Sequence, residues 1–509
     1  MKPILALVLA AGLACPVAAN AAELMVGFTV DPLTLDPANH RSRETETVIR
    51  DLYDGLLTRD SGMIVQPELA SSFIQIDPLT WEFELRDGVK FHDGTTMTAD
   101  DVKFTFDRLI VENAMGGQTS PRKSLLGPVK AVQVVDAGTV RFVLSDPWPI
   151  LPAMLPFQEV VSKSFVEKNG DAALATTENG TGPFKLVDWR KGEAVIMERF
   201  DDYYGGAAGI PPVGKACVDR VIFRIIPENA SRVAALLAGD VDIINELPAH
   251  DIGQVEANPD TRVMAVNGTR TFFVAINNTK KPFDDLRVRQ AFNHAVDKGL
   301  IIDKILAGKA TPLNGVLSPD AFAFDAGLKS YAYDPGLARR LLAEAGYPDG
   351  IDVVIDTRAE YKDLVEALAA VMAKSGIRAQ VMVGEASVLA TKWDPKAAKE
   401  GDLYFTSWGN GSLDPYDIMN PVLMTAARGN TAGYANAEVD ELLEAGETEA
   451  DPAKRADLYK KAQQIVNADA PWVFLWLPQD IYGVSTRVSN WQPSPDSRIN
   501  LHDACVTGG

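Results

Sequence analysis

The sequence predicts a mixed α/β protein that is built from two lobes. Its 509 residues exceed the roughly 250–300 residues that a single hydrophobic core organises. Hydrophobic residues make up 46% and charged residues 23% of the chain, which is the balance of a soluble globular protein. Strand and helix patterns alternate through the second half, and this order builds an α/β sheet. No low-complexity linker divides the chain, so we expect the lobes to join through crossing strands.

Residues 1–21 are predicted to be a cleaved signal peptide, which places the mature protein in the periplasm. Lys2 gives a basic start, residues 4–14 form an apolar run, and Ala19-Asn20-Ala21 offers small residues for cleavage. The apolar run is too short to anchor the chain in a membrane. Cys15 raises the alternative of a lipoprotein, although Leu13 lies one place away from where a lipobox needs it.

The net charge and the cysteines further limit which partners and which covalent cross-links the protein can have. The formal net charge is −20, and cleavage removes Lys2 and no acid. Such an acidic chain repels phosphate backbones, so nucleic acid is excluded as a partner. Cys217 and Cys505 remain after cleavage, and an even pair in an oxidising compartment favours a disulfide that ties the C-terminal tail to the first lobe. Two free buried thiols are the alternative.

Side-chain periodicity predicts the main elements. Residues 81–85 alternate apolar and polar side chains, as a half-buried strand does. Thr98 with Asp101, and Asp451 before Pro452, are helix starts. Strands are predicted at 24–28, 81–85, 132–135, 139–144, 218–226, 271–277, 353–355 and 381–383. Helices are predicted at 44–57, 98–109, 231–237, 288–295, 337–345, 364–375 and 452–468. Residues 272–277 and 476–482 are the predicted crossings between the lobes.

Signatures of catalysis and of metal binding are absent from the sequence. It contains no G-x-S-x-G and no H-E-x-x-H, and no two of its five histidines (40, 92, 250, 294 and 502) have metal-ligand spacing. Residues 209–215 resemble a phosphate-binding loop, but Ala216 follows where a hydroxyl is needed, and two prolines remove N–H donors. We therefore predict no catalytic residue, no metal and no cofactor.

A series of ordered motifs resembles one protein family. Residues 67–109 contain PELASSF, WEFELRDGVKFHDG and TADDVKFTF, which look like the signature of the family 5 extracellular solute-binding proteins of ABC importers. Further matches follow in order, at GTGPF (180–184), AGDVD (238–242), PFDDLRVRQAFNHA (282–295), LLAEAGYPDG (341–350), and Trp408 with Asp414-Pro415. The resemblance covers nearly the whole mature chain.

The resemblance implies a periplasmic binding protein fold of type II, in its large peptide-binding subclass, with mixed sheets in each lobe and a hinge of two or three crossing strands. Lobe I is expected at 22–271, with an extra subdomain at about 60–180, and it resumes at 483–509. Lobe II is expected at 272–482.

The function implied is not enzymatic. A monomer would bind a peptide or a peptide-like, carboxylate-bearing small molecule and deliver it to the permease subunits in the inner membrane. An opine-like conjugate, a nickel chelate, and service as a ligand presenter for a chemoreceptor or as a folding helper stay open. A secreted hydrolase is the rival from another class.

The family resemblance also nominates ligand-binding residues. Arg358 follows a strand where peptide-binding members place the arginine that grips the ligand carboxylate, and Trp408 is expected to form a flat wall. Dipeptide-binding members have an aspartate three residues after this tryptophan, where this chain has Gly411. An ammonium there would be unpaired, so either the ammonium is met elsewhere or the solute lacks a free ammonium at that point, and an ordinary free dipeptide is disfavoured. The other nominated residues are Asn410, Asp414, Glu46 and Phe157.

Overall fold

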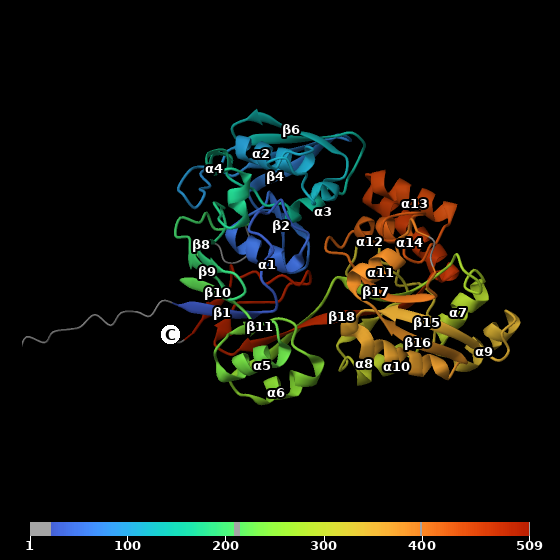
Figure 1. The fold of residues 1–509 in the computed structure, drawn as a ribbon. Coiled ribbons are helices and arrows are strands. Elements are labelled where there is room, and N and C mark those ends of the chain that lie inside the picture. Colours follow the sequence, from blue (N-terminus) through green and yellow to red (C-terminus); the bar gives the residue numbers. More distant parts are fainter. Residues whose placement is uncertain (1–21, 208–213, 398–399, 508–509) are drawn as a thin grey trace, which may run out of the picture.

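The computed structural model describes residues 22–207, 214–397 and 400–507. The predicted signal peptide, residues 1–21, lies outside them. Two lobes lie side by side, and the long strand β18 (Trp472–Ser485) passes from one to the other (Figure 1). No helix in the described ranges is both long enough and apolar enough to span a membrane.

Lobe I is organised on a sheet that begins with the predicted first strand. β1 (Glu23–Phe28) pairs in parallel with β10 (Arg220–Ile225) and β11 (Ile243–Ile244). β10 continues antiparallel into β9 (Ala194–Arg199), which pairs with β8 (Phe184–Arg190). The helices of this lobe include α1 (Arg43–Leu52), α5 (Asn229–Ala238) and α6 (Ile252–Ala257). Val48, Leu52 and Phe223 belong to its buried core.

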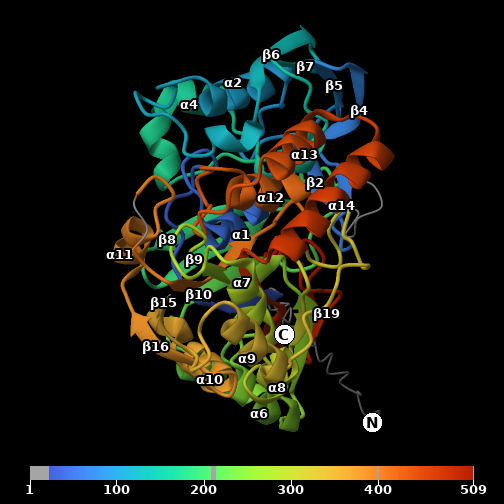
Figure 2. The same cartoon turned by 90° about the vertical axis from the view of Figure 1, so that its right-hand side faces the viewer.

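A second layer of lobe I has its own core, within the range predicted for the extra subdomain. Its sheet has the order β4 (Ala70–Asp77), β5 (Thr80–Leu85), β7 (Thr139–Leu144), β6 (Val129–Asp136). α2 (Ala99–Ile110) packs on it, and the Asp101 carboxylate accepts the Thr98 N–H at 2.9 Å as the predicted cap. The layer also includes α3 (Leu151–Met154), α4 (Lys163–Asn169), β2 (Leu57–Arg59) and β3 (Val65–Pro67). Its helix α2 and its strands β6 and β7 lie at the top of the view in Figure 2.

Lobe II has the strand order β16 (Ile377–Val383), β15 (Ile351–Thr357), β17 (Leu403–Gly409), β13 (Arg270–Ile276), β18, with β14 (Ala310–Pro312) paired to β18. Its helices are α7 (Leu286–His294), α8 (Lys298–Lys304), α9 (Pro335–Glu344), α10 (Lys362–Ala373), α11 (Ala386–Lys392), α12 (Pro415–Leu423), α13 (Ala437–Thr448) and α14 (Pro452–Asp469). Separate apolar clusters bury residues of β15 with α10, and residues of α12 with α14.

Two strand crossings connect the lobes. β12 (Thr261–Asn267) leads through Gly268-Thr269 into β13. β18 pairs with β13 from Trp472 to Trp476, and with β12 from Gln479 to Ser485. The partner of β18 therefore changes between Trp476 and Gln479, inside the predicted return crossing and a few residues before the 482/483 boundary.

The Gly-Thr-Gly-Pro turn sets the position of α1. A Cβ on Gly180 would lie 2.0 Å from the Leu52 carbonyl oxygen, and one on Gly182 would lie 2.5 Å from the Leu52 carbonyl carbon. Only glycine permits this approach. The turn therefore fixes the C-terminal end of α1. The N-terminal end of the same helix lies at the boundary between the lobes.

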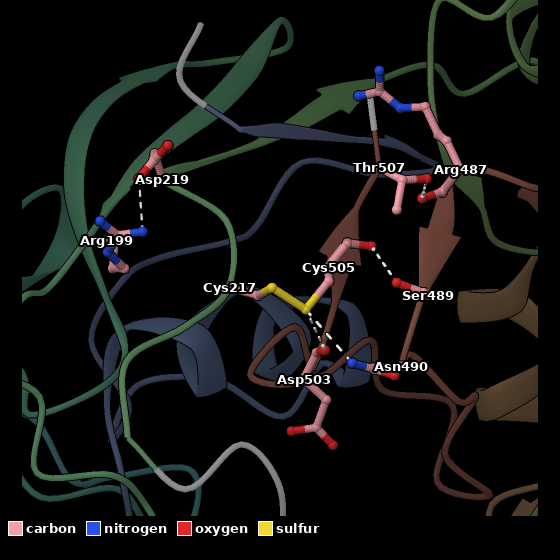
Figure 3. The surroundings of a disulfide bond; sticks show 9 residues. All are labelled: Arg199, Cys217, Asp219, Arg487, Ser489, Asn490, Asp503, Cys505 and Thr507. Carbon is pink, nitrogen blue, oxygen red and sulfur yellow. Dashed lines mark hydrogen bonds and ion pairs between the residues drawn. A yellow bond between two sulfur atoms is a disulfide. The ribbon is translucent and has the colours of Figure 1, made fainter. Parts of the chain in front are cut away.

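A disulfide joins Cys217 to Cys505, which are 288 residues apart. Cys505 begins β20 (Cys505–Val506), which pairs with β19 (Val488–Ser489) (Figure 3). The bond anchors the C-terminal segment to lobe I, close to where Arg199 pairs with Asp219 at 2.6 Å. Asp496, Ser497 and Arg498 of this segment reach the cleft between the lobes.

Candidate ligand-binding cleft

The cleft consists of two adjoining cavities of about 500 and 680 Å³. Arg43, Glu44 and Arg270 line both cavities, so we treat them as one space. Arg43 and Glu44 open α1 in lobe I, whereas Arg270 begins the hinge strand β13. Among the described residues, no group of three or more His, Cys, Asp or Glu side chains could hold a metal ion.

Glu46 forms the centre of a buried ionic network at the floor of the first cavity. Its carboxylate accepts from Arg122 at 2.8 Å and from Arg498 at 3.2 Å. Burial by itself raises the pKa of Glu46, but the charges of Arg122 and Arg498 outweigh burial and lower this pKa. Glu46 is thus a fixed anion that holds two arginines at the cleft floor.

Phe157 extends from lobe I toward Gly411 of lobe II. Its ring lies 4.5 Å from the Arg59 guanidinium carbon and 5.1 Å from that of Arg498, and such stacking restrains an aromatic ring. A Cβ on Gly411 would lie 3.2 Å from the ring. The ring would therefore have to shift before a longer side chain could fit at the position where dipeptide-binding members have an aspartate.

Trp408 lies near the end of β17 and lines the first cavity. Its indole N–H donates to the Asp417 carbonyl oxygen at 3.0 Å, so this donor is engaged within the protein. The Arg428 guanidinium carbon lies 4.8 Å from the ring centroid. The tryptophan therefore supports an arginine at the cavity wall.

The remaining nominated residues lie in different surroundings. Arg358 lines the second cavity and pairs with Glu360 at 2.7 Å. Asp414 caps α12, and both of its oxygens accept from Arg455 at 2.7 Å. Asn410 is buried, accepts from Ser412 through its side chain and bonds Thr269 through its backbone. Neither Asn410 nor Asp414 is among the lining residues of the two cavities.

The two cavities differ in charge. Six arginines and four carboxylates line the first cavity. Three arginines and four carboxylates line the second, where Glu246 and Asp480 add negative charge. Burial raises the pKa of both Glu246 and Asp480, because removal from water disfavours the charged form of a carboxyl. By the count of side chains, the cleft is thus basic at one end, whereas the other end has one carboxyl more than it has arginines.

Sequence reasoning missed all six arginines at the basic end, since the one arginine that it nominated, Arg358, lines the second cavity. Arg41 and Arg43 flank the N-cap Ser42, and Arg270 begins a crossing strand. Arg428 follows α12, and Arg498 comes from the C-terminal segment. The pattern Arg-Ser-Arg before a helix, and an arginine at the first position of a predicted crossing strand, are the two signals that could have pointed to this group.

One expected result concerns Glu159, next to the Glu46 network. Burial, and then the charge of Glu46, raise the pKa of Glu159 to about 8. The folded protein thus keeps a proton that the unfolded chain, with a pKa of 4.5, has released. This contribution to stability is lost as the pH rises toward 8. His40 and His502, whose pKa values burial lowers to about 4 and about 3, act in the opposite direction below pH 6.5.

The unfolding free energy of the wild type should therefore fall between pH 7 and 8. We expect that of Glu159→Gln to fall less over this range, by up to ~1.4 kcal/mol per pH unit. Burial also raises the pKa of Asp503, to about 7, so a smaller slope remains. Urea unfolding at several pH values measures how the unfolding free energy of the wild type and that of Glu159→Gln change with pH. Equal slopes for the two proteins would mean that Glu159 is ionised in the fold.

Comparison with known proteins agrees with this architecture. Residues 65–430 match the model of the bacterial extracellular solute-binding proteins, family 5. The glutathione-binding protein GsiB of Pectobacterium atrosepticum is 31% identical over 98% of this chain and 97% of its own. Among solved structures, HbpA2 of Haemophilus parasuis (TM-score 0.85, 24% identity) covers 95% of this chain and 100% of its own, which supports the fold.

The DppA protein of Helicobacter pylori, solved in complex with the peptide STSA, has a TM-score of 0.79 and 26% identity, and the match covers 96% of this chain and 98% of that one. The relatives named for a ligand are binding proteins rather than enzymes. The family match spans well over half of the residues, and the same two-lobed fold surrounds the cleft. The chain therefore belongs to the bacterial extracellular solute-binding proteins of family 5.

Proposed function

We propose that this chain is the periplasmic capture subunit of an ABC importer for a small peptide-like solute with at least two carboxylates. The observation that carries the proposal is the excess of arginine in the first cavity. In the described part of the chain, Arg41, Arg43, Arg270 and Arg428 have no carboxylate within 4.0 Å, the ion-pair distance. Guanidinium groups suit carboxylates because their donors match both oxygens.

Glutathione is the first solute to test. It carries two carboxylates and one ammonium, and it is the ligand named for the GsiB relative. Its carboxylates would lie among the arginines of the first cavity. Its ammonium would lie near Glu246 and Asp480 in the second cavity. These two carboxyls would then take the place of the aspartate that dipeptide-binding members have at the position of Gly411.

The mechanism needs no catalysis. The signal peptide predicted at 1–21 would direct export. Lobe I (22–271 and 483–509) and lobe II (272–482) would rotate about the β12–β13 and β18 crossings and enclose the solute. The closed form would then dock, as a monomer, on the permease subunits, and a separate ATPase would supply the energy.

A panel of solutes tests the proposal on ligand-stripped protein. We expect glutathione to raise the unfolding free energy by about 2.7 kcal/mol at 100 times its Kd. Glutathione monoethyl ester, which has almost the same size and one carboxylate fewer, is the matched control and should bind at least about tenfold more weakly. Neutral dipeptides, opine conjugates, and nickel with and without histidine complete the panel. Equal binding of the ester and of neutral dipeptides would refute the requirement for carboxylates, and a shift only with nickel and histidine would indicate a metal chelate.

The arginine contribution has its own test. Arg270→Gln removes one cleft charge and should weaken glutathione binding by about tenfold to hundredfold. Arg340→Gln removes an exposed charge in α9 and should leave Kd unchanged, because Arg340 lines neither cavity. Calorimetric titration of both variants gives the comparison. A normal Kd for Arg270→Gln would remove this residue from the site.

A further inference from the structure

The arginines without carboxylate partners form two pairs, and each pair spans the cleft. Arg41 of lobe I faces Arg428 of lobe II, and both line the first cavity and the smaller one beside it. Arg43 of lobe I faces Arg270 at the hinge, and both line the two large cavities. Positive charge therefore faces positive charge twice, between the two lobes in the outer pair and between lobe I and the hinge strand in the inner pair.

The outer pair is positioned by contacts within each lobe. Arg41 donates to the Pro121 carbonyl oxygen and to Ser124 Oγ, both at 3.1 Å. Arg428 stacks on Trp408. Desolvation in the cleft, and then the charge of Arg428, lower the pKa of Arg41. Each guanidinium is thus restrained by its own lobe while it repels the other.

The inner pair lies over Gly409. A Cβ on Gly409 would be 3.3 Å from Arg43 Nη2 and 3.4 Å from Arg270 Nη2. Arg43 donates to Ser497 and Thr269, and Arg270 donates to Ser407. These acceptors are neutral hydroxyls, and the hydrogen bond of Asp480 in this group is to the Ser497 hydroxyl, while its charge acts on Arg43 and Arg270 from beyond ion-pair distance.

The other carboxylates of the first cavity have their direct partners elsewhere, and the charges of Asp417 and Glu46 reach Arg41, and that of Glu44 reaches Arg270, only from a distance. Glu46 pairs with Arg122 and Arg498, and Asp496 pairs with Arg498 at 2.5 Å. Asp417 accepts from the Ser412 backbone and hydroxyl, and Glu44 accepts from the Ser42 hydroxyl. The described chain therefore does not supply an anion between the members of either pair.

The lobes already touch beside these pairs. Phe157 approaches Gly411, and the rings of Trp148 and Tyr416 have centroids 5.8 Å apart. Like charges that face each other across such a contact oppose closure, and an anion between them reverses the sign of the interaction.

We propose that the Arg41–Arg428 and Arg43–Arg270 pairs are two carboxylate subsites that act as an electrostatic latch, so that only a solute with two carboxylates, one for each pair, closes the cleft. This deepens the proposed function and rests on it for the identity of the solute. A solute with one carboxylate satisfies one pair and leaves the other repulsive. Selectivity for dicarboxylates would then arise at closure as well as at initial contact.

The latch can be tested without any solute. Arg428→Glu places a carboxylate opposite Arg41, so the ligand-free variant should be more compact than ligand-free wild type in small-angle X-ray scattering. Arg340→Glu makes the same change of charge in α9, outside the cleft cavities, and should leave the scattering unchanged. Arg270→Glu, opposite Arg43, is the equivalent variant for the inner pair. Circular dichroism and thermal unfolding show that each variant is folded.

A second measurement uses wild-type protein only. Salt screens repulsion between solvent-reachable charges, so the ligand-free protein should become more compact as the salt concentration rises. The latch is overturned if folded Arg428→Glu and Arg270→Glu stay as extended as wild type, or if salt leaves the wild-type scattering unchanged. Failure of the solute panel on wild-type protein would instead reject the proposed ligand class, because the ligand-free scattering does not depend on it.

Discussion

Replacing Cys217 and Cys505 by serine is expected to lower the free energy of unfolding by about 5 kcal/mol. The disulfide closes a loop of 288 residues, and the entropy that such a bond removes from the unfolded chain grows with the logarithm of loop length. Denaturant unfolding of the double variant measures the loss.

The effect should extend to the cleft. The segment anchored by Cys505 carries Asp496, Ser497 and Arg498, which line the cavities, and Arg498 holds Glu46. We therefore expect weaker glutathione binding in the double variant. Reductant should destabilise the wild type and leave the double variant unaffected. Equal stability of the two proteins would contradict the role assigned to the bond.

Asp414→Ala is expected to cost about 3–5 kcal/mol. It leaves the guanidinium of Arg455 buried without its bidentate partner, since both Asp414 oxygens accept from Arg455 at 2.7 Å. The same variant removes the cap of α12, the helix that follows the Trp408 loop.

Asp451 provides a matched control. Both aspartates cap a helix and precede a proline at its first position, but Asp451 is exposed and accepts only backbone N–H groups, from Ala453 and Lys454. Asp451→Ala should cost about 1 kcal/mol, the usual value for a cap. Similar losses for the two variants would show that the Asp414–Arg455 pair adds little beyond capping.

The charge distribution of the cleft connects these results to function. The chain as a whole is strongly acidic, with a net charge of −20, yet the first cavity concentrates arginine. The surface as a whole would thus repel an anionic solute, whereas the arginines of the first cavity would attract it. This contrast favours selection by charge over selection by size alone.

The aspartate missing at Gly411 acquires a physical explanation from the structure. Phe157, restrained between Arg59 and Arg498, approaches Gly411 so closely that an aspartate side chain would meet the ring. Phe157 and Gly411 are far apart in sequence, so no local pattern could connect them. The sequence shows that the aspartate of the dipeptide-binding pattern is replaced by Gly411. It does not show that Phe157 lies against this position.

The sequence by itself determined the family, the fold class and most of the regular elements. Motifs such as Gly180-Thr181-Gly182 and the Thr98–Asp101 cap act locally, through backbone sterics and hydrogen bonds between near neighbours, so a linear pattern records them. It also nominated Glu46, Phe157, Trp408 and Gly411, which line the first cavity.

Only the tertiary structure decided which charges face each other. Arg41 and Arg428 become neighbours because the two lobes face each other across the cleft, and Glu46 and Arg498 because the C-terminal segment returns to lobe I after β18. Whether an arginine is paired depends on such long-range contacts, and sequence spacing carries no record of them. The arginine pairs of the cleft are consequences of the fold because electrostatic interaction follows distance in space rather than distance along the chain.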